Sequence, residues 1–263
     1  MANQINHINN TTLPAPNFRL DGQTALITGA GRGIGLAAAV ALAQAGATVT
    51  LAARSEDELA AACKDINAQG GKADYAVMDV TDAAAVTTMI ESRGPFNVLV
   101  NNAGINRPKP LVEVTNEDID DILALNVKSV FYVARAVAKG LLKAGQAGSI
   151  INISSQMGHV GAPRRTVYCA SKHAVEGMTK ALAWELGQQN IRVNTICPTF
   201  IETSLTKGMF DDPEFKQSVI SKIALGRVGQ IDEMMGAVVF LASPASSLVT
   251  GSALMLDGGW TAT

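Results

Sequence analysis

The chain contains few residues of several types that define large classes of proteins. Its 263 residues include three cysteines and three histidines, and aromatic residues make up 5%. Cys63, Cys169 and Cys197 are odd in number and far apart, which excludes a disulfide framework. Neither a CxxC pair nor an HExxH motif occurs. We therefore expect no metal site, and the class of zinc-dependent alcohol dehydrogenases is excluded.

Charge of one sign and long apolar runs are also scarce. The 21 basic and 23 acidic residues nearly cancel, so a nucleic-acid partner is not expected. The apolar stretch 37–53 is interrupted by Gln44 and Gly46 and is shorter than the roughly 20 residues of a membrane span. The N-terminal residues lack the apolar core of a signal peptide. We expect a soluble, cytoplasmic protein with no membrane partner and a small-molecule substrate.

Short apolar runs alternate with alanine-rich helical patterns along most of the chain. Strands are predicted at Thr24–Thr28, Thr48–Ala52, Ala73–Met78, Asn97–Asn101, Ser149–Ile153, Ile191–Ile196 and Ala253–Leu256. Helices are predicted near 34–45, 55–68, 82–92, 117–144, 166–188 and 231–242. This order predicts an α/β fold, with one doubly wound domain over 19–263 built on a seven-stranded parallel sheet with helices on both faces. Residues 1–18, rich in Asn, Thr and Pro, are predicted to form a flexible tail.

A glycine-rich turn follows the first predicted strand. Its sequence, Thr28-Gly29-Ala30-Gly31-Arg32-Gly33-Ile34-Gly35, leads directly into a helical pattern. Glycines let the backbone approach phosphates, and a helix N-terminus offers unpaired N–H groups. The turn therefore predicts binding of a dinucleotide; the alternative is a tight turn that serves only helix packing.

A tyrosine and a lysine lie one turn apart on the helix predicted near 166–188. Tyr168 and Lys172 are i and i+4, so both side chains leave the same face. A nearby ammonium group favours phenolate and lowers the pKa of a tyrosine toward neutral pH. Ser155 ends a predicted strand, where open α/β sheets place ligands. This combination predicts proton transfer by Tyr168 to or from a substrate oxygen that Ser155 orients.

Taken together, these motifs resemble the classical short-chain dehydrogenase/reductase family. The resemblance rests on the spacing TGxxxGxG, on Asp79, Asn101-Asn102-Ala103-Gly104, Asn126, Ser154-Ser155, Tyr168-Cys169-Ala170-Ser171-Lys172 and Asp257-Gly258-Gly259, in that order. It implies a single-domain Rossmann-type fold. It also implies an NAD(P)-dependent oxidoreductase that interconverts a carbonyl and a secondary alcohol by hydride transfer.

The same resemblance implies roles for individual residues. Asn126, Ser155, Tyr168 and Lys172 would be catalytic, with Asn126 holding a water that connects Lys172 to solvent; Ser154 is the competing serine. The implied cofactor-binding residues are Gly29, Arg32, Gly33, Ile34, Gly35, Arg54, Asp79, Val80, Asn102, Ala103, Gly104, Tyr168, Lys172, Pro198, Ile201 and Thr203. Alternatives are a helix kink or polar core residue for Asn126 and a helix N-cap for Asp79. Thr199 departs from the family, which usually has glycine there.

The end of the second predicted strand bears on the choice of cofactor. An acid there would accept hydrogen bonds from a ribose hydroxyl and repel a 2′-phosphate. Here Ala53 and Arg54 occupy the position, and Arg32 lies in the glycine loop. Arginine suits phosphate. NADP(H) is therefore favoured; the alternative is NAD(H), with Arg54 stacked on adenine or solvated.

The substrate is less well defined by the sequence. The expected substrate-binding residues are Ser155, Gln156, His159, Arg165 and Tyr168, which suit a polar substrate: a sugar, polyol, hydroxy acid or 3-oxoacyl group. The alternative for Arg165 is a surface charge. Residues 199–227 interrupt the strand–helix rhythm and are interpreted as a substrate lid, or else as an ordinary surface helix pair.

Two helices predict assembly. Those near 117–144 and 166–188 have more apolar positions than one sheet face covers, and in the family these helices pair across a two-fold axis. We expect a homotetramer with dihedral symmetry, its second interface formed by the last strand and Trp260.

Two other functions remain open: a non-catalytic nucleotide-binding regulator, and a dehydratase or epimerase that keeps its cofactor bound.

Overall fold

The computed structural model describes residues 15–203 and 206–262, and the predicted α/β architecture is confirmed. Seven parallel strands pair in the order β3-β2-β1-β4-β5-β6-β7. Their bounds are β1 Thr24–Thr28, β2 Thr48–Ala53, β3 Lys72–Val77, β4 Val98–Asn101, β5 Gly148–Ile153, β6 Ile191–Pro198 and β7 Ala253–Leu256. The predicted strands therefore all exist, displaced at their ends by two residues at most.

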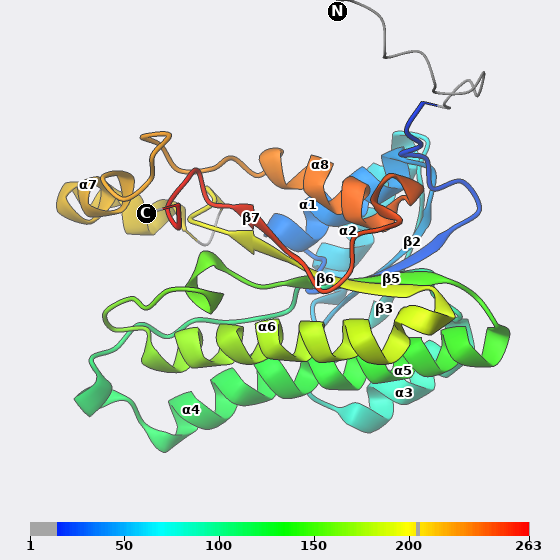
Figure 1. The fold of residues 1–263 in the computed structure, drawn as a ribbon, viewed down its shortest axis with the longest axis horizontal. Coiled ribbons are helices and arrows are strands. Elements are labelled where there is room, and N and C mark those ends of the chain that lie inside the picture. The colour runs from blue at the N-terminus through cyan, green and yellow to red at the C-terminus, as the bar shows by residue number, and fades with distance from the viewer. Residues whose placement is uncertain (1–14, 204–205, 263) are drawn as a thin grey trace, which may run out of the picture.

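Helices cover both faces of this sheet (Figure 1). The α-helices are α1 Gly33–Gln44, α2 Glu56–Ala68, α3 Ala83–Arg93, α4 Asn116–Leu123, α5 Ser129–Ala144, α6 Thr166–Leu186, α7 Pro213–Ile220 and α8 Glu233–Ala242. Helices α1, α2 and α8 pack on one face, and α3, α5 and α6 on the other. Within the described part of the chain, no helix is long and apolar enough to cross a membrane.

Each central strand contributes to two hydrophobic cores. In β1, Ile27 packs into the core under α1 and α8, while Leu26 packs into the core under α3 and α5. In β5, Ile151 and Ile150 divide in the same way, and all four side chains are fully buried. Burial of successive residues explains why these strands are continuously apolar rather than alternating.

The strand order reverses between β1 and β4. Because β1 pairs with β2 on one side and β4 on the other, the loops that follow β1 and β4 leave the carboxyl edge of the sheet side by side. A ligand site is expected at such a switch point. The glycine loop, the loop after Asn101 and Ser155 follow strands at this edge, and Pro198 ends β6 there.

One local expectation is wrong, and one alternative is excluded. The single helix predicted over 117–144 is divided by a π-helical turn, η2 Ala124–Lys128, between α4 and α5. Helix α3 is capped by Asp82, whose carboxylate accepts from the backbone of Ala84 and Ala85, so Asp79 is not an N-cap.

Two segments bear on the predicted tail and lid. Most of the tail predicted over 1–18 lies outside the described residues, and those described, 15–18, are exposed and irregular. The segment predicted as a lid contains a 3₁₀ turn, η5 Lys207–Asp211, followed by α7, at the carboxyl edge of the sheet (Figure 1).

Candidate active site

The glycine loop has the backbone geometry that a phosphate cradle requires. Gly29 and Gly33 have φ of +62° and +58°, a region that residues with a side chain rarely adopt. A Cβ at Gly35 would overlap the Gly29 carbonyl, so Gly35 lets α1 approach the loop closely. The N-cap of α1, Arg32, makes no side-chain cap, and the first turn holds no acid. The uncapped N–H groups and positive potential of this helix end fit an anionic group.

The loop after β4 is fastened to the glycine loop. Asn102 Nδ2 donates to the carbonyl oxygens of Thr28 (3.0 Å) and Gly29 (3.1 Å). In return, Thr28 Oγ1 accepts from the backbone N–H groups of Asn102 (3.0 Å) and Ala103 (3.2 Å). Asn102, Ala103 and Gly104 therefore lie beside the expected dinucleotide site. The hydrogen bonds of Asn102 set the distance between the glycine loop and the loop after β4.

The expected adenine end is more open. Asp79 is exposed, and its Oδ1 accepts from the backbone and hydroxyl of Thr81, which lower the pKa of the carboxyl. Val80 is buried in the core. Arg54 is exposed, and its charge also lowers the pKa of Asp79, so the Arg54 guanidinium lies near the expected adenine end. Arg32 Nη1 pairs with Glu58 Oε1 at 3.0 Å, a partner that the sequence patterns do not indicate.

At the chemical end, the π turn carries Asn126. Its side chain is buried and spans the loop after β4: Oδ1 accepts from Ile105 N–H (2.8 Å) and Nδ2 donates to Ile105 carbonyl (2.9 Å) and Ser171 Oγ (3.1 Å). A Cβ at Gly104 would lie 3.2 Å from Asn126 Oδ1 and 3.8 Å from Lys172 Nζ. The kink and polar-core readings of Asn126 are thus compatible with a place beside Lys172.

Ser155 and Tyr168 lie together. Ser155 Oγ donates to Gln156 Oε1 (2.7 Å) and accepts from Met157 N–H (3.1 Å), which orients the hydroxyl at the start of the 3₁₀ turn η3 Gln156–Gly158. The same hydroxyl lowers the pKa of Tyr168. Burial has the larger effect and raises that pKa overall. The Ser155 hydroxyl and the Tyr168 phenol therefore influence one another, as their expected roles at one substrate oxygen require.

Lys172 is buried and held by the backbone. Its Nζ donates to the Ile153 carbonyl at 2.8 Å and lies 5.7 Å from the centroid of the Tyr168 ring. Burial lowers the pKa of Lys172 to about 8, opposed by Cys197 and Glu176. The expected lowering of the Tyr168 pKa by this ammonium group is not found. The cation that lowers it is Arg165.

The segment after β6 accommodates Thr199 without strain. Among the described residues, only Arg164 and Asn190 combine a side chain with a positive φ, so Thr199 does not need the conformation that glycine favours. Its Oγ1 is buried and has no hydrogen-bond partner among the described residues. Ile201 is buried and Thr203 bonds with Thr206. An unpartnered hydroxyl next to Pro198 fits the carboxamide end of a nicotinamide.

Of the residues expected around the substrate, Gln156 and His159 contact other polar side chains, whereas Arg165 has no acidic partner among the described residues. Gln156 is buried and occupied with Ser155, and His159 turns its ring toward Glu176 and Cys197. Arg165 is half-buried and lies over the Phe200 ring at 5.3 Å from its centroid. No acid pairs with Arg165 within the described ranges. Arg165 is therefore not a solvated surface charge, whereas Arg164 is exposed.

Sequence reasoning missed an ion-pair cluster that braces the loop after β4. Asp118 is buried and pairs with Lys109 (2.6 Å) and Arg107 (3.3 Å), while Lys109 N–H donates to the Arg164 carbonyl at 2.9 Å. This joins the loop to the residues just before α6. The acid-rich run at 117–121 was the available signal, but its partners could not be assigned from spacing.

Comparison with known proteins agrees with this geometry. A family model described as enoyl-(acyl carrier protein) reductase matches residues 29–261. Gluconate 5-dehydrogenase of Gluconobacter oxydans is 41% identical over 248 residues, covering 93% of this chain and 96% of that protein. The 3-oxoacyl-[acyl-carrier-protein] reductase of Thermotoga maritima is 43% identical over 247 residues, covering 92% of this chain and 99% of that protein.

A solved structure is similar over almost the whole fold. The crystal structure of a gluconate 5-dehydrogenase from Burkholderia cenocepacia, in complex with NADP and tartrate, has a TM-score of 0.90 and 40% identity, covering 94% of this chain and 98% of that one. The chain thus belongs to the classical short-chain dehydrogenase/reductase family and is an NAD(P)-dependent oxidoreductase that interconverts a carbonyl and a secondary alcohol.

Proposed function

We propose that the chain is an NADP(H)-preferring oxidoreductase whose substrate is a small polar hydroxy or keto carboxylate. The observation that carries this proposal is Arg165, a half-buried guanidinium without an acidic partner in the described structure. Burial lowers its pKa, which means that the charged form loses hydration without gaining an acid. Such a charge is stabilised when an anion binds.

The position of Arg165 relates it to the reacting oxygen. It precedes Tyr168 by three residues, and its charge lowers the pKa of that phenol. A carboxylate on Arg165 and a carbonyl or hydroxyl between Ser155 and Tyr168 would belong to one compact molecule. The Gluconobacter relative is a gluconate dehydrogenase and the Burkholderia structure contains tartrate, so both support a carboxylate substrate.

The four residues expected to be catalytic, Asn126, Ser155, Tyr168 and Lys172, support the proton chemistry. Bound nicotinamide would supply or accept the hydride. Ser155 donates to the substrate oxygen, and Tyr168 delivers or removes its proton. Lys172 would hold the ribose hydroxyls of the cofactor, while Asn126, fixed by Ile105 and Ser171, would hold the water that resupplies the proton. The raised pKa of half-buried Tyr168 suits a proton donor, provided that bound cofactor and Lys172 would stabilise the phenolate afterward.

The proposed NADP(H) preference rests on two arginines. Arg54 is exposed and has no ion pair within 15–203 or 206–262, which leaves it available for a 2′-phosphate. Arg32 would exchange Glu58 for the phosphate. The Burkholderia structure, which contains NADP, agrees with this choice. NAD(H) remains the alternative.

We also propose that residues 199–227 form a lid and that four subunits assemble. Phe210 and Phe215 from this segment pack against Phe200, the ring under Arg165, at 6.0 and 5.8 Å between centroids. Closure would therefore cover the proposed carboxylate site.

The proposed tetramer is supported by exposed aromatic side chains on two helices. Trp184 on α6 is 89% exposed and Phe131 on α5 is 47% exposed, in line with burial by a second copy. Three free cysteines agree with a reducing compartment such as the cytoplasm.

The test pairs acids with neutral polyols of equal length and measures kcat/KM with both cofactors. Arg165→Gln should raise KM for the acid about ten- to a hundredfold, the scale of a charge-assisted hydrogen bond, and leave KM for the neutral substrate unchanged, while any change in kcat through the pKa of Tyr168 should be the same for both substrates. Arg164→Gln, at the exposed neighbouring arginine, is the matched control. Equal use of acid and polyol by the parent enzyme would refute the carboxylate assignment. Light scattering at the monomer mass would refute the tetramer.

A further inference from the structure

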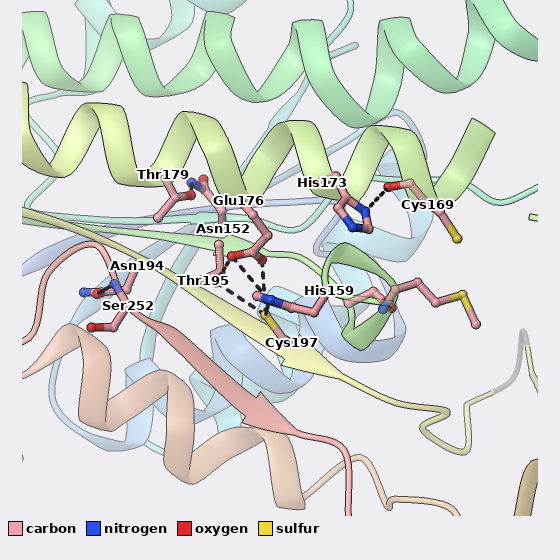
Figure 2. Close-up of polar contacts among 12 residues, drawn as sticks. Asn152, His159, Cys169, His173, Glu176, Thr179, Asn194, Thr195, Cys197 and Ser252 are labelled. Carbon is pink, nitrogen blue, oxygen red and sulfur yellow. Dashed lines mark hydrogen bonds and ion pairs between the residues drawn. The ribbon is translucent and has the colours of Figure 1, made fainter. Parts of the chain in front are cut away.

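Three segments bring a thiol, an imidazole and a carboxylate together (Figure 2). His159 follows η3, Glu176 lies in α6 and Cys197 lies in β6. Cys197 Sγ is 3.2 Å from Glu176 Oε1 and 3.5 Å from His159 Nε2, and His159 Nε2 is 3.5 Å from Glu176 Oε2. Within the described structure, this is the group of three such side chains whose ligating atoms all lie within 4.8 Å of one another.

These separations match those of a coordination tetrahedron. Zinc binds sulfur at about 2.3 Å, imidazole nitrogen at about 2.0–2.1 Å and carboxylate oxygen at about 2.0–2.2 Å. At tetrahedral angles, these bond lengths place the ligand atoms roughly 3.4–3.6 Å apart. The thiol sulfur and the imidazole nitrogen are 3.5 Å apart, whereas Glu176 approaches them with different oxygens, Oε1 at 3.2 Å from the sulfur and Oε2 at 3.5 Å from the nitrogen. One ligand atom from each residue lies within 4.8 Å of the other two, so a rotation of the Glu176 carboxylate would bring one oxygen toward both and form one face of the tetrahedron.

The carboxylate of Glu176 lacks a strong cationic partner. It is 5% exposed and is met by the thiol, the imidazole and the Thr195 hydroxyl, which donates to Oε2 at 3.1 Å. Lys172 donates to the Ile153 carbonyl and forms no ion pair with Glu176. A buried carboxylate with only weak donors has a high free energy that a cation would lower.

A second observation points independently to a ligand. Ser154 is 3% exposed, and its Oγ has no hydrogen-bond partner among the described residues. A Cβ at Gly158 would lie 3.0 Å from this Oγ and 3.1 Å from Glu176 Cγ, so the hydroxyl lies beside the cluster. An unpartnered hydroxyl at this place can bond a water in a fourth coordination position.

We propose that His159, Glu176 and Cys197 bind one zinc-type divalent cation, with a water as the fourth ligand. A thiolate and an imidazole select such a cation over magnesium or calcium, which prefer oxygen ligands. Binding forms a metal–sulfur bond in place of the S–H bond, and one proton leaves to solvent for each cation bound. Thiolate and carboxylate then neutralise the two charges of the cation.

The site escapes motif analysis because its ligands are distant in sequence. Residues 159, 176 and 197 belong to no CxxC or HExxH pattern, so the expectation of no metal site addressed only local motifs. An entry route exists, since the His159 side chain is 29% exposed whereas Glu176 and Cys197 are buried.

The proposal is tested by equilibrium dialysis of the full, untagged chain against Zn²⁺ and Co²⁺. The expected result is one cation per chain, one proton released per cation, a thiolate-to-cobalt charge-transfer band, and a Tm raised by bound metal. Cys197→Ser and Glu176→Gln should each weaken binding by at least about a hundredfold, more than the ten- to hundredfold cost of losing an outer-shell partner.

Cys63→Ser is the matched control, because Cys63 is also a buried thiol but lies in α2, away from the cluster. It should bind one cation with unchanged affinity and keep the cobalt band. The proposal is overturned by a parent that takes up less than one cation per chain. Binding that survives Cys197→Ser and Glu176→Gln, or is lost in Cys63→Ser, overturns it as well.

Discussion

The two ends of the expected cofactor site differ in how their charged groups are held. At the adenine end, Arg32 and Arg54 are exposed, and the partner of Arg32 is itself 39% exposed. At the nicotinamide end, Lys172 is buried and Asn126 is fixed by a two-way hydrogen bond to Ile105. Groups that recognise a charge arriving from solvent can remain mobile, whereas groups that transfer a proton must be held in place before the substrate binds.

The largest expected effect comes from removing the proton donor at the buried end. Tyr168→Phe deletes one hydroxyl and keeps the ring that Lys172 faces, so turnover should fall by about a hundred- to ten-thousandfold. Cofactor affinity, measured by binding to the apo-enzyme, should change little. Near-normal turnover in this variant would remove Tyr168 from the mechanism.

Next in size is a pH effect on stability at the same end. The pKa of Lys172 is lowered from 10.5 to about 8, so between these values the unfolded chain binds more protons than the folded one. Stability therefore rises with pH over this window, by up to about 3 kcal/mol. In Lys172→Met this contribution should disappear. Urea unfolding at pH 7.5 and 10, without cofactor and at one protein concentration, makes the comparison; parallel pH dependence of parent and variant would contradict the burial argument.

At the open end, Arg54→Ala should act on one cofactor only. Loss of a charge-assisted bond to the 2′-phosphate costs roughly 1.5–3 kcal/mol, or about ten- to a hundred-and-fifty-fold in affinity for NADP(H). NAD(H) lacks that phosphate and should hardly respond. The measurement is kcat/KM for both cofactors. A parent that prefers NAD(H), or an equal loss with both, would assign Arg54 to adenine stacking or to the surface.

The smallest expected effect is at Glu58. Its exposed pair with Arg32 is worth at most about 1 kcal/mol, so Glu58→Gln should free Arg32 and improve NADP(H) affinity by less than about fivefold. Glu56→Gln is the matched control, because Glu56 lies in the same helical turn but bonds the Tyr75 hydroxyl. A similar gain in both variants would mean that only the overall charge matters.

The sequence was sufficient to predict the strands and most helices, because these elements follow the spacing of apolar residues along the chain. The seven strands are buried on both faces, and their apolar runs are bounded by turns and helices. The order of the motifs likewise placed Ser155, Tyr168 and Lys172 on neighbouring elements. These features depend on residues close in sequence or on connections of a known hand.

Contacts between distant surfaces could not be predicted. Glu58 against Arg32, and Cys197 against Glu176, join residues 26 and 21 positions apart through tertiary packing. The divided helix also escaped prediction, since apolar spacing over 117–144 does not distinguish a π turn from an α turn. The pKa of Tyr168 was expected to follow its nearest cation, but burial has the larger effect.

The π turn over Ala124–Lys128 has a consequence for how this site can be lost. A π turn is equivalent to one residue inserted in an α-helix, and each residue of an α-helix turns the following side chains by about 100°. Shortening this turn by one residue would let α4 and α5 join as one regular helix while swinging the amide of Asn126 away from Ile105. A change in chain length, with every remaining side chain intact, would thus displace the amide that we propose holds a water.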